Sequence, residues 1–132
     1  MIEQSDSDLK ADILIVEDHP TMRKTMRIIL EQEGFNLREA GDGKTAMEMI
    51  EEKVPDIVFL DLNMPPPDGA EVLRWIRSDP KTSSAKVIIV TAQGEESRRD
   101  VMSLGADHYF IKPFSPLGLL ATIDEVLAGE VG

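Results

Sequence analysis

Four short apolar runs, each leading into a polar residue, constrain the fold more than any other feature of the sequence. They begin at Ile13, Ile57, Val87 and Tyr109, and the segments between them are long enough to form helices. Short β-branched runs that alternate with helical stretches indicate a parallel sheet, because parallel strands need long crossover connections. Parallel strands end at a common edge, and open α/β sheets bind their ligands there.

The residues that follow these runs are three acids, a hydroxyl and an ammonium. The first run leads into Glu17 and Asp18, the second ends at Asp61, and the last two end at Thr91 and Lys112. A parallel sheet would bring these groups together from distant parts of the chain. Carboxylate oxygens are the ligands that Mg²⁺ prefers, and a lysine binds phosphate as a point charge. The grouping therefore predicts a cation with an anion beside it.

Strand and helix alternate five times along the sequence. We expect strands over 12–17, 36–40, 56–61, 86–91 and 107–111, and helices over 20–33, 43–53, 69–78, 95–104 and 115–128. The last helix should bury Leu120, Ile123 and Leu127, which have core spacing. Right-handed crossovers with helices on both faces then predict a doubly wound α/β sheet, but periodicity alone does not choose among its possible strand orders.

Length and composition predict a single domain. The chain has 132 residues, of which 42% are hydrophobic, and this is enough for one core. We expect a flexible N-terminal tail over 1–11, the domain over 12–128 and a short C-terminal tail over 129–132. No apolar stretch is long enough for a membrane span, and the lack of cysteine fits a cytoplasmic protein. The net charge of −11 argues against a nucleic acid as direct partner.

Taken together, these segments resemble the receiver domain of two-component response regulators, in particular the single-domain chemotaxis type. The resemblance covers about 12–127. It rests on motifs in four segments: Glu17-Asp18, the stretch from Asp61 to Pro65 followed by Asp68-Gly69, Thr91, and Lys112-Pro113. The resemblance implies a five-stranded, flavodoxin-like parallel sheet with strand order 2-1-3-4-5. It also implies a cis peptide bond between Lys112 and Pro113.

The resemblance implies a chemical role for the residues at the predicted edge. Asp61 is similar to the phospho-acceptor of the family, and Thr91 and Lys112 are similar to its hydroxyl and its lysine. Glu17, Asp18 and Asp61 would hold Mg²⁺ or Mn²⁺. The family more often has aspartate where this chain has Glu17, so Asp18 is expected to be the stronger ligand. Alone, each residue has an ordinary structural alternative, such as a strand end or a solvated acid.

Neighbouring residues would assist this site. Asn63 matches the family position whose backbone carbonyl touches the metal. The side chains of Asn63, Ala92 and Gln93 would tune hydrolysis of the acyl phosphate. Thr91 and Tyr109 would form the switch, with Tyr109 at the aromatic position of the family.

The implied function is a signalling switch rather than an enzyme. A sensor histidine kinase or a histidine phosphotransfer protein would donate the phosphoryl group, and the domain would catalyse only its own phosphorylation and slow dephosphorylation. A downstream protein would bind the face formed by residues 95–104, 107–111 and 115–128. The last of these segments offers Asp124 and Glu125 but no lysine or arginine. We therefore expect little dimerisation through charge pairs on that face.

Two other classes of protein share part of the pattern. An aspartate-based phosphohydrolase would use the same acids, but such enzymes typically carry an aspartate at the position of Asn63. A flavodoxin-like binding module would need a phosphate-binding loop after the first strand, where Glu17 and Asp18 would repel a phosphate. The sequence does not identify the kinase or the output. A stand-alone receiver and the first domain of a longer regulator both fit it.

Two further positions bear on the site. Pro66-Pro67 replaces a stretch that usually carries an apolar residue in the family, and proline stiffens the loop. His19 follows the acidic pair and is interpreted as a polar surface residue rather than a catalytic one.

Overall fold

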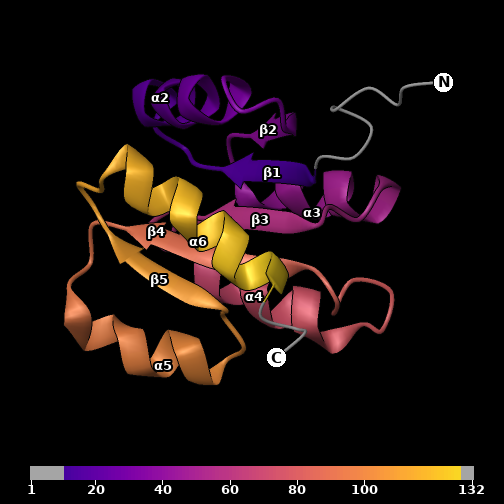
Figure 1. Cartoon of the computed structure of the whole chain (residues 1–132). Helices are drawn as coiled ribbons and strands as arrows, with labels where there is room; N and C mark the ends of the chain where they lie inside the picture. Colours follow the sequence, from indigo (N-terminus) through magenta and orange to yellow (C-terminus); the bar gives the residue numbers. More distant parts are fainter. Residues whose placement is uncertain (1–10, 129–132) are drawn as a thin grey trace, which may run out of the picture.

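Five parallel strands form one sheet. The structure is a computed structural model that describes residues 11–128; residues 1–10 of the N-terminal tail expected over 1–11, and the C-terminal tail expected over 129–132, lie outside the described residues. The strands are β1 (Asp12–Val16), β2 (Asn36–Ala40), β3 (Ile57–Leu60), β4 (Lys86–Thr91) and β5 (His108–Ile111). Their order is β2-β1-β3-β4-β5, and their arrows point to a common edge (Figure 1). The fold class and the strand order are confirmed.

Helices cover both faces of the sheet. They are α2 (Pro20–Glu31), α3 (Gly43–Glu52), α4 (Gly69–Ser78), α5 (Arg98–Ser103) and α6 (Pro116–Ala128). The single helix expected over 95–104 is instead a 3₁₀ turn, η1 (Glu95–Ser97), followed by the short α5. Figure 1 shows α6 lying across the sheet. Within residues 11–128, none of the helices has the length and hydropathy to cross a bilayer.

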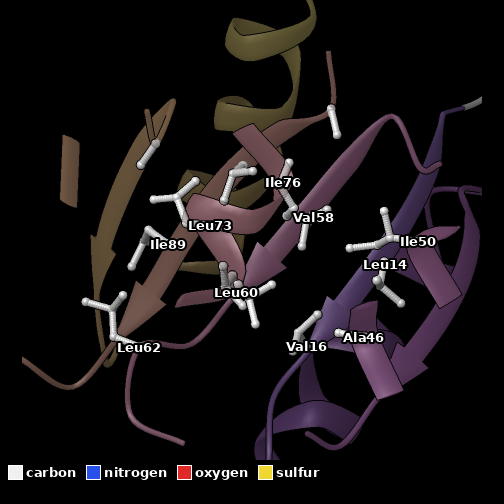
Figure 2. Close-up of a cluster of buried hydrophobic side chains, with 14 of the residues drawn as sticks. Leu14, Val16, Ala46, Ile50, Val58, Leu60, Leu62, Leu73, Ile76 and Ile89 are labelled. Atoms are coloured by element: carbon white, nitrogen blue, oxygen red, sulfur yellow. The ribbon is translucent and has the colours of Figure 1, made fainter. Parts of the chain in front are cut away.

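The alternation of side chains along the strands creates two cores. In β1, Ile13 and Ile15 pack with α2 and α6, whereas Leu14 and Val16 pack with α3 and α4. Figure 2 shows part of the second core, in which Val58 and Leu60 of β3 meet Leu73 and Ile76 of α4. The central strands are buried on both faces, as parallel strands between two helical layers must be.

The buried face of α6 differs from the expected one. Leu119, Ile123 and Val126 are buried, whereas Leu120 and Leu127 are only partly covered. The prediction was therefore right for Ile123 and wrong for the two leucines. Apolar residues occupy most of this helix, so several faces fit the pattern and packing against β4 and β5 decides between them.

The start of α4 is fixed directly behind the end of β3. Asp68 and Glu71 form a capping box, in which each side chain accepts from the backbone N–H of the other residue. Gly69 follows, and a Cβ at this position would lie 2.3 Å from the carbonyl oxygen of Asp61. Only glycine lets the first turn of α4 pack this closely, so the turn supports the backbone of the residue that ends β3.

At the opposite end of α4, Arg77 ties three segments together. Its guanidinium donates to the carbonyl oxygens of Ala85 at 2.6 Å and of Gly105 at 2.9 Å, and it pairs with Asp107 at 2.9 Å. Asp107 also accepts from the backbone N–H of Val87. The side chain thus joins α4 to the starts of β4, which ends at Thr91, and of β5, whose second residue is Tyr109.

Candidate functional site

The polar residues at the strand ends converge as their spacing predicts. The backbone N–H of Asp61 donates to the carbonyl of Val16 at 3.1 Å, and that of Lys112 donates to the carbonyl of Thr91 at 2.8 Å. The Lys112 Nζ lies 2.8 Å from Glu17 Oε1 and 3.3 Å from Asp61 Oδ2. The ends of β1, β3 and β5 therefore meet at one ammonium group, and the end of β4 is bonded to the backbone of the same lysine.

This cluster is buried, and burial shapes its electrostatics. Glu17 is 1% exposed and Asp61 is 3% exposed. Burial raises the pKa of Glu17 above its ordinary value, and the charge of Asp61 adds to this effect. Burial alone would lower the pKa of Lys112, but the hydrogen bond to Glu17 and the charge of Asp61 raise it overall. Lys112 is therefore a fixed positive charge beside both carboxylates.

Asp18 completes the acidic pocket and offers an unused ligand atom. Its Oδ1 is buried and has no hydrogen-bond partner among residues 11–128. In contrast, Glu17 Oε1 pairs with Lys112, and Glu17 Oε2 accepts from the backbone N–H of His19 at 3.2 Å. Two carboxylates, those of Glu17 and Asp61, share one ammonium and Asp18 lies beside Glu17, so the pocket carries excess negative charge. Carboxylate oxygens with excess charge fit a divalent cation, and Asp18 Oδ1 is the atom best placed to bind it.

His19 lies at the rim of this pocket. Its side chain is 74% exposed, and its Nδ1 is 3.5 Å from both Glu17 Oε2 and Asp18 Oδ1. It is a surface residue, as expected, but its ring approaches the acids more closely than the sequence pattern indicated.

The loop after β3 is tied to the end of β4 through two side-chain amides. The Asn63 N–H donates to Asp61 Oδ1 at 3.1 Å, and the Gln93 N–H donates to Thr91 Oγ1 at 3.2 Å. Between them, Gln93 Nε2 donates to Asn63 Oδ1 at 2.6 Å. Ala92, also named from the sequence, is exposed beside this bridge. The amides of Asn63 and Gln93 therefore span the gap between Asp61 and Thr91.

Tyr109 is buried, with 2% of its surface exposed. Its hydroxyl donates to the carbonyl of Gly94 at 2.8 Å, and the guanidinium carbon of Arg98 lies 4.9 Å from the ring centroid. Burial raises the pKa of the Tyr109 hydroxyl, which therefore remains a neutral donor. The ring thus links β5 to the segment that leads into α5.

Sequence reasoning missed Ser97. Its hydroxyl donates to Gln93 Oε1, so the amide bridge continues to the residue that precedes α5. A serine before a short charged helix gives no signal of such a contact, because serine is common at helix starts.

Two X-Pro peptide bonds among residues 11–128 are cis. Lys112-Pro113 was expected to be cis, whereas Pro66-Pro67 was not.

The chain resembles known proteins in both sequence and fold. The family model of the response regulator receiver domain matches residues 13–124. The chain belongs to this family. A chemotaxis protein of Vibrio cholerae, CheY4, superposes with a TM-score of 0.82 at 26% identity, covering 89% of this chain and 98% of the other. A putative response regulator from Chloroflexus aurantiacus gives 0.85 at 30% identity and covers 90% and 98%.

Sequence relatives include longer regulators. The receiver is 39% identical to the probable transcriptional regulator ycf27 of Guillardia theta, over 92% of this chain and 47% of that protein. It is 37% identical to the phosphate regulon transcriptional regulatory protein PhoB of Escherichia coli, over 87% of this chain and 51% of PhoB. The chain therefore spans about half the length of these relatives. It is a receiver of the two-component type, a phospho-accepting signalling switch.

Proposed function

We propose that Asp61 is the residue that accepts the phosphoryl group, from a phosphohistidine of a sensor kinase or of a histidine phosphotransfer protein. The observation that carries this proposal is the position of the Lys112 ammonium. Its Nζ lies within 3.3 Å of both Asp61 Oδ2 and Glu17 Oε1. Asp61 is the acid that directly follows a buried central strand, and Gly69 keeps its backbone in close contact with α4.

The transfer uses the carboxylate itself as nucleophile. An oxygen of Asp61 attacks phosphorus, the phosphorus–nitrogen bond of the donor breaks, and its electron pair leaves with the imidazole. The product is an acyl phosphate on Asp61. Lys112 offsets charge on the phosphoryl oxygens, and the Thr91 hydroxyl can donate to one of them. Asn63 stands where an aspartate-based phosphohydrolase would carry its general acid, and an amide cannot donate a proton in that way.

A divalent cation would reduce the repulsion between the acids and the phosphoryl group. Glu17, Asp18, Asp61 and the backbone carbonyl of Asn63 would hold it, with Mg²⁺ or Mn²⁺ as the ion that such oxygen ligands favour. The free Oδ1 of Asp18 supports this assignment. Because the oxygens of Glu17 are already occupied by Lys112 and His19, its contribution would be the weaker one.

The output would be conformational. We assign the switch to Thr91 and Tyr109, and the partner surface to the face of α5, β5 and α6. The helix α5 has one buried side chain, Val101, so its position is the least costly to change. The net charge of −11 favours a protein partner over a nucleic acid. Exchange with a histidine kinase would place the domain in the cytoplasm, and we expect no catalytic activity beyond phosphorylation and dephosphorylation of the domain itself.

Acetyl phosphate with Mg²⁺ tests the acceptor assignment. Intact mass should show one added phosphoryl group in the wild type and none in Asp61→Asn. Asp56→Asn is a matched control, because Asp56 is an exposed acid at the start of β3, away from the strand ends, and it should label fully. Turnover of phosphomonoesters would instead favour a phosphohydrolase, and full labelling of Asp61→Asn would refute the assignment.

A further inference from the structure

We infer that Ser97 is a positioning residue that sets the lifetime of the acyl phosphate and couples this lifetime to the position of α5. The inference rests on the proposed role of Asp61 as acceptor. Ser97 would influence hydrolysis of the acyl phosphate through two intervening side chains, those of Gln93 and Asn63.

A continuous chain of hydrogen bonds carries the inference. The Ser97 hydroxyl donates to Gln93 Oε1, and Gln93 Nε2 donates to Asn63 Oδ1 at 2.6 Å. Both ends of the Gln93 amide are therefore engaged, one by the acceptor loop and the other by the start of α5. A side-chain amide held at both ends has one orientation, whereas an amide held at one end can rotate.

The same two amides are attached to the reacting groups. The backbone N–H of Asn63 donates to Asp61 Oδ1, and that of Gln93 donates to Thr91 Oγ1. The bridge therefore crosses from the acceptor to the hydroxyl that would face the phosphoryl group. Any water that attacks phosphorus from this side must pass the two amides.

The Ser97 hydroxyl can donate to Gln93 because it does not cap α5. Ser97 occupies the position before α5, where a serine hydroxyl usually accepts from the backbone of the first turn, but its side chain makes no such bond. Its hydroxyl instead donates toward the site. Because Ser97 ends η1 and directly precedes α5, a displacement of α5 moves this hydroxyl as well.

The surroundings leave α5 room to move. A cleft of about 270 Å³ lies between α4 and α5, and Leu62, Gln93, Ser97 and Val101 are among the residues that line it. Movement of α5 into or away from this cleft would carry Ser97 with it and release Gln93. A partner that docks on α5 would then change the lifetime of the phosphoryl group without touching Asp61.

The reaction under control is hydrolysis of the acyl phosphate. A water oxygen bonds to phosphorus, the bond from phosphorus to the Asp61 oxygen breaks, and its electron pair returns to the carboxylate. Inorganic phosphate leaves, and the proton of the attacking water passes to the phosphate or to solvent. The amide bridge limits this step by keeping Asn63 and Gln93 in place across the approach.

The test compares dephosphorylation after acetyl phosphate is removed, with loss of the phosphoryl group followed by intact mass. Ser97→Ala should lose the phosphoryl group about fivefold faster than the wild type, as expected for one lost hydrogen bond. Ser97→Thr keeps the hydroxyl and should restore the slower rate. Ser103→Ala is the control, because Ser103 bonds only within α5, to the carbonyl of Asp100, and it should behave as the wild type.

A second readout separates positioning from a loss of stability. In the unphosphorylated protein, the side-chain NH₂ signals of Asn63 and Gln93 should shift in Ser97→Ala and stay unchanged in Ser103→Ala. Equal dephosphorylation rates in Ser97→Ala and the wild type, or unchanged NH₂ signals, would overturn the inference. If the wild type takes no label on Asp61, the proposed function fails and the inference fails with it, whatever the NH₂ signals show.

Discussion

Glu17, Asp18 and Asp61 face a single lysine, and this imbalance is the main property of the site at the scale of residues. Burying carboxylates is unfavourable unless each finds a partner, and Lys112 serves two of them. The raised pKa of Glu17 reflects this crowding, with burial as its first cause. Functional sites commonly trade stability for reactivity in this way. Two predictions follow from the imbalance.

The first prediction concerns the affinity of the site for a divalent cation. Asp18→Ala should lower Mg²⁺ affinity by at least about tenfold, and Glu17→Ala should lower it less, because Asp18 Oδ1 accepts no hydrogen bond among residues 11–128 whereas Glu17 is already paired with Lys112. Titration calorimetry measures both. The Mg²⁺ affinity of the wild type should also fall with decreasing pH, because protonation of the carboxylates removes ligand charge. Since the pKa of Glu17 is raised, Glu17 should be protonated at a higher pH than an exposed glutamate.

Conversely, Asp18→Ala with the affinity of the wild type would remove Asp18 from the site. A larger loss in Glu17→Ala than in Asp18→Ala would show that Glu17 exchanges Lys112 for the metal.

The second prediction concerns the stability of the protein without a metal ion. Asp61→Asn removes one of the crowded charges and leaves Glu17 as the closer partner of Lys112, at 2.8 Å. The free energy of unfolding should therefore stay equal to that of the wild type or rise by about 1 kcal/mol, as for other functional residues that oppose stability. Urea denaturation in the presence of a chelator measures this. A loss of more than about 2 kcal/mol would mean that the Asp61–Lys112 contact holds the fold together.

At the scale of elements, the sequence predicted the strand ends well and the helix faces less well. Asp61 and Lys112 directly follow apolar runs, so a parallel sheet leaves them little choice of position. The face of α6 was ambiguous because Leu120 and Leu127 compete with equally apolar neighbours. The bridge from Asn63 through Gln93 to Ser97 was not predictable, since it depends on how the loop after β3 meets the loop after β4 rather than on any period of the sequence.

The clamp formed by Arg77 gives a prediction at this scale. Arg77→Ala should lower the free energy of unfolding by about 2–3 kcal/mol, because its loss leaves partly buried carbonyls and Asp107 without this donor. Arg74→Ala is the matched control on the same helix: Arg74 is exposed, and it makes no ion pair or hydrogen bond among residues 11–128. Chemical denaturation should show a change below about 0.5 kcal/mol for Arg74→Ala. Equal losses in the two variants would show that the clamp contributes little.

At the scale of the whole molecule, the site and the proposed output surface lie on different parts of one rigid sheet. Arg77 fixes the starts of β4 and β5. Thr91 ends β4 at the site, and the Tyr109 hydroxyl of β5 donates to Gly94, in the segment that leads into α5. The segment over 93–98 lies between the site and the output surface, and it is held by side-chain hydrogen bonds rather than by a buried apolar side chain. A change of charge at Asp61 should therefore be expressed as a shift in an existing equilibrium of this segment and α5.

Amide NMR of the whole domain with a beryllofluoride mimic of the phosphoryl group and Mg²⁺ tests this coupling most directly. In the wild type, shifts should extend from Asp61 to Tyr109 and to residues 95–104. In Thr91→Ala, the mimic should still bind, but the shifts at Tyr109 and α5 should shrink, because the hydroxyl that relays the change is missing. Shifts confined to the neighbourhood of Asp61 in the wild type would contradict the account.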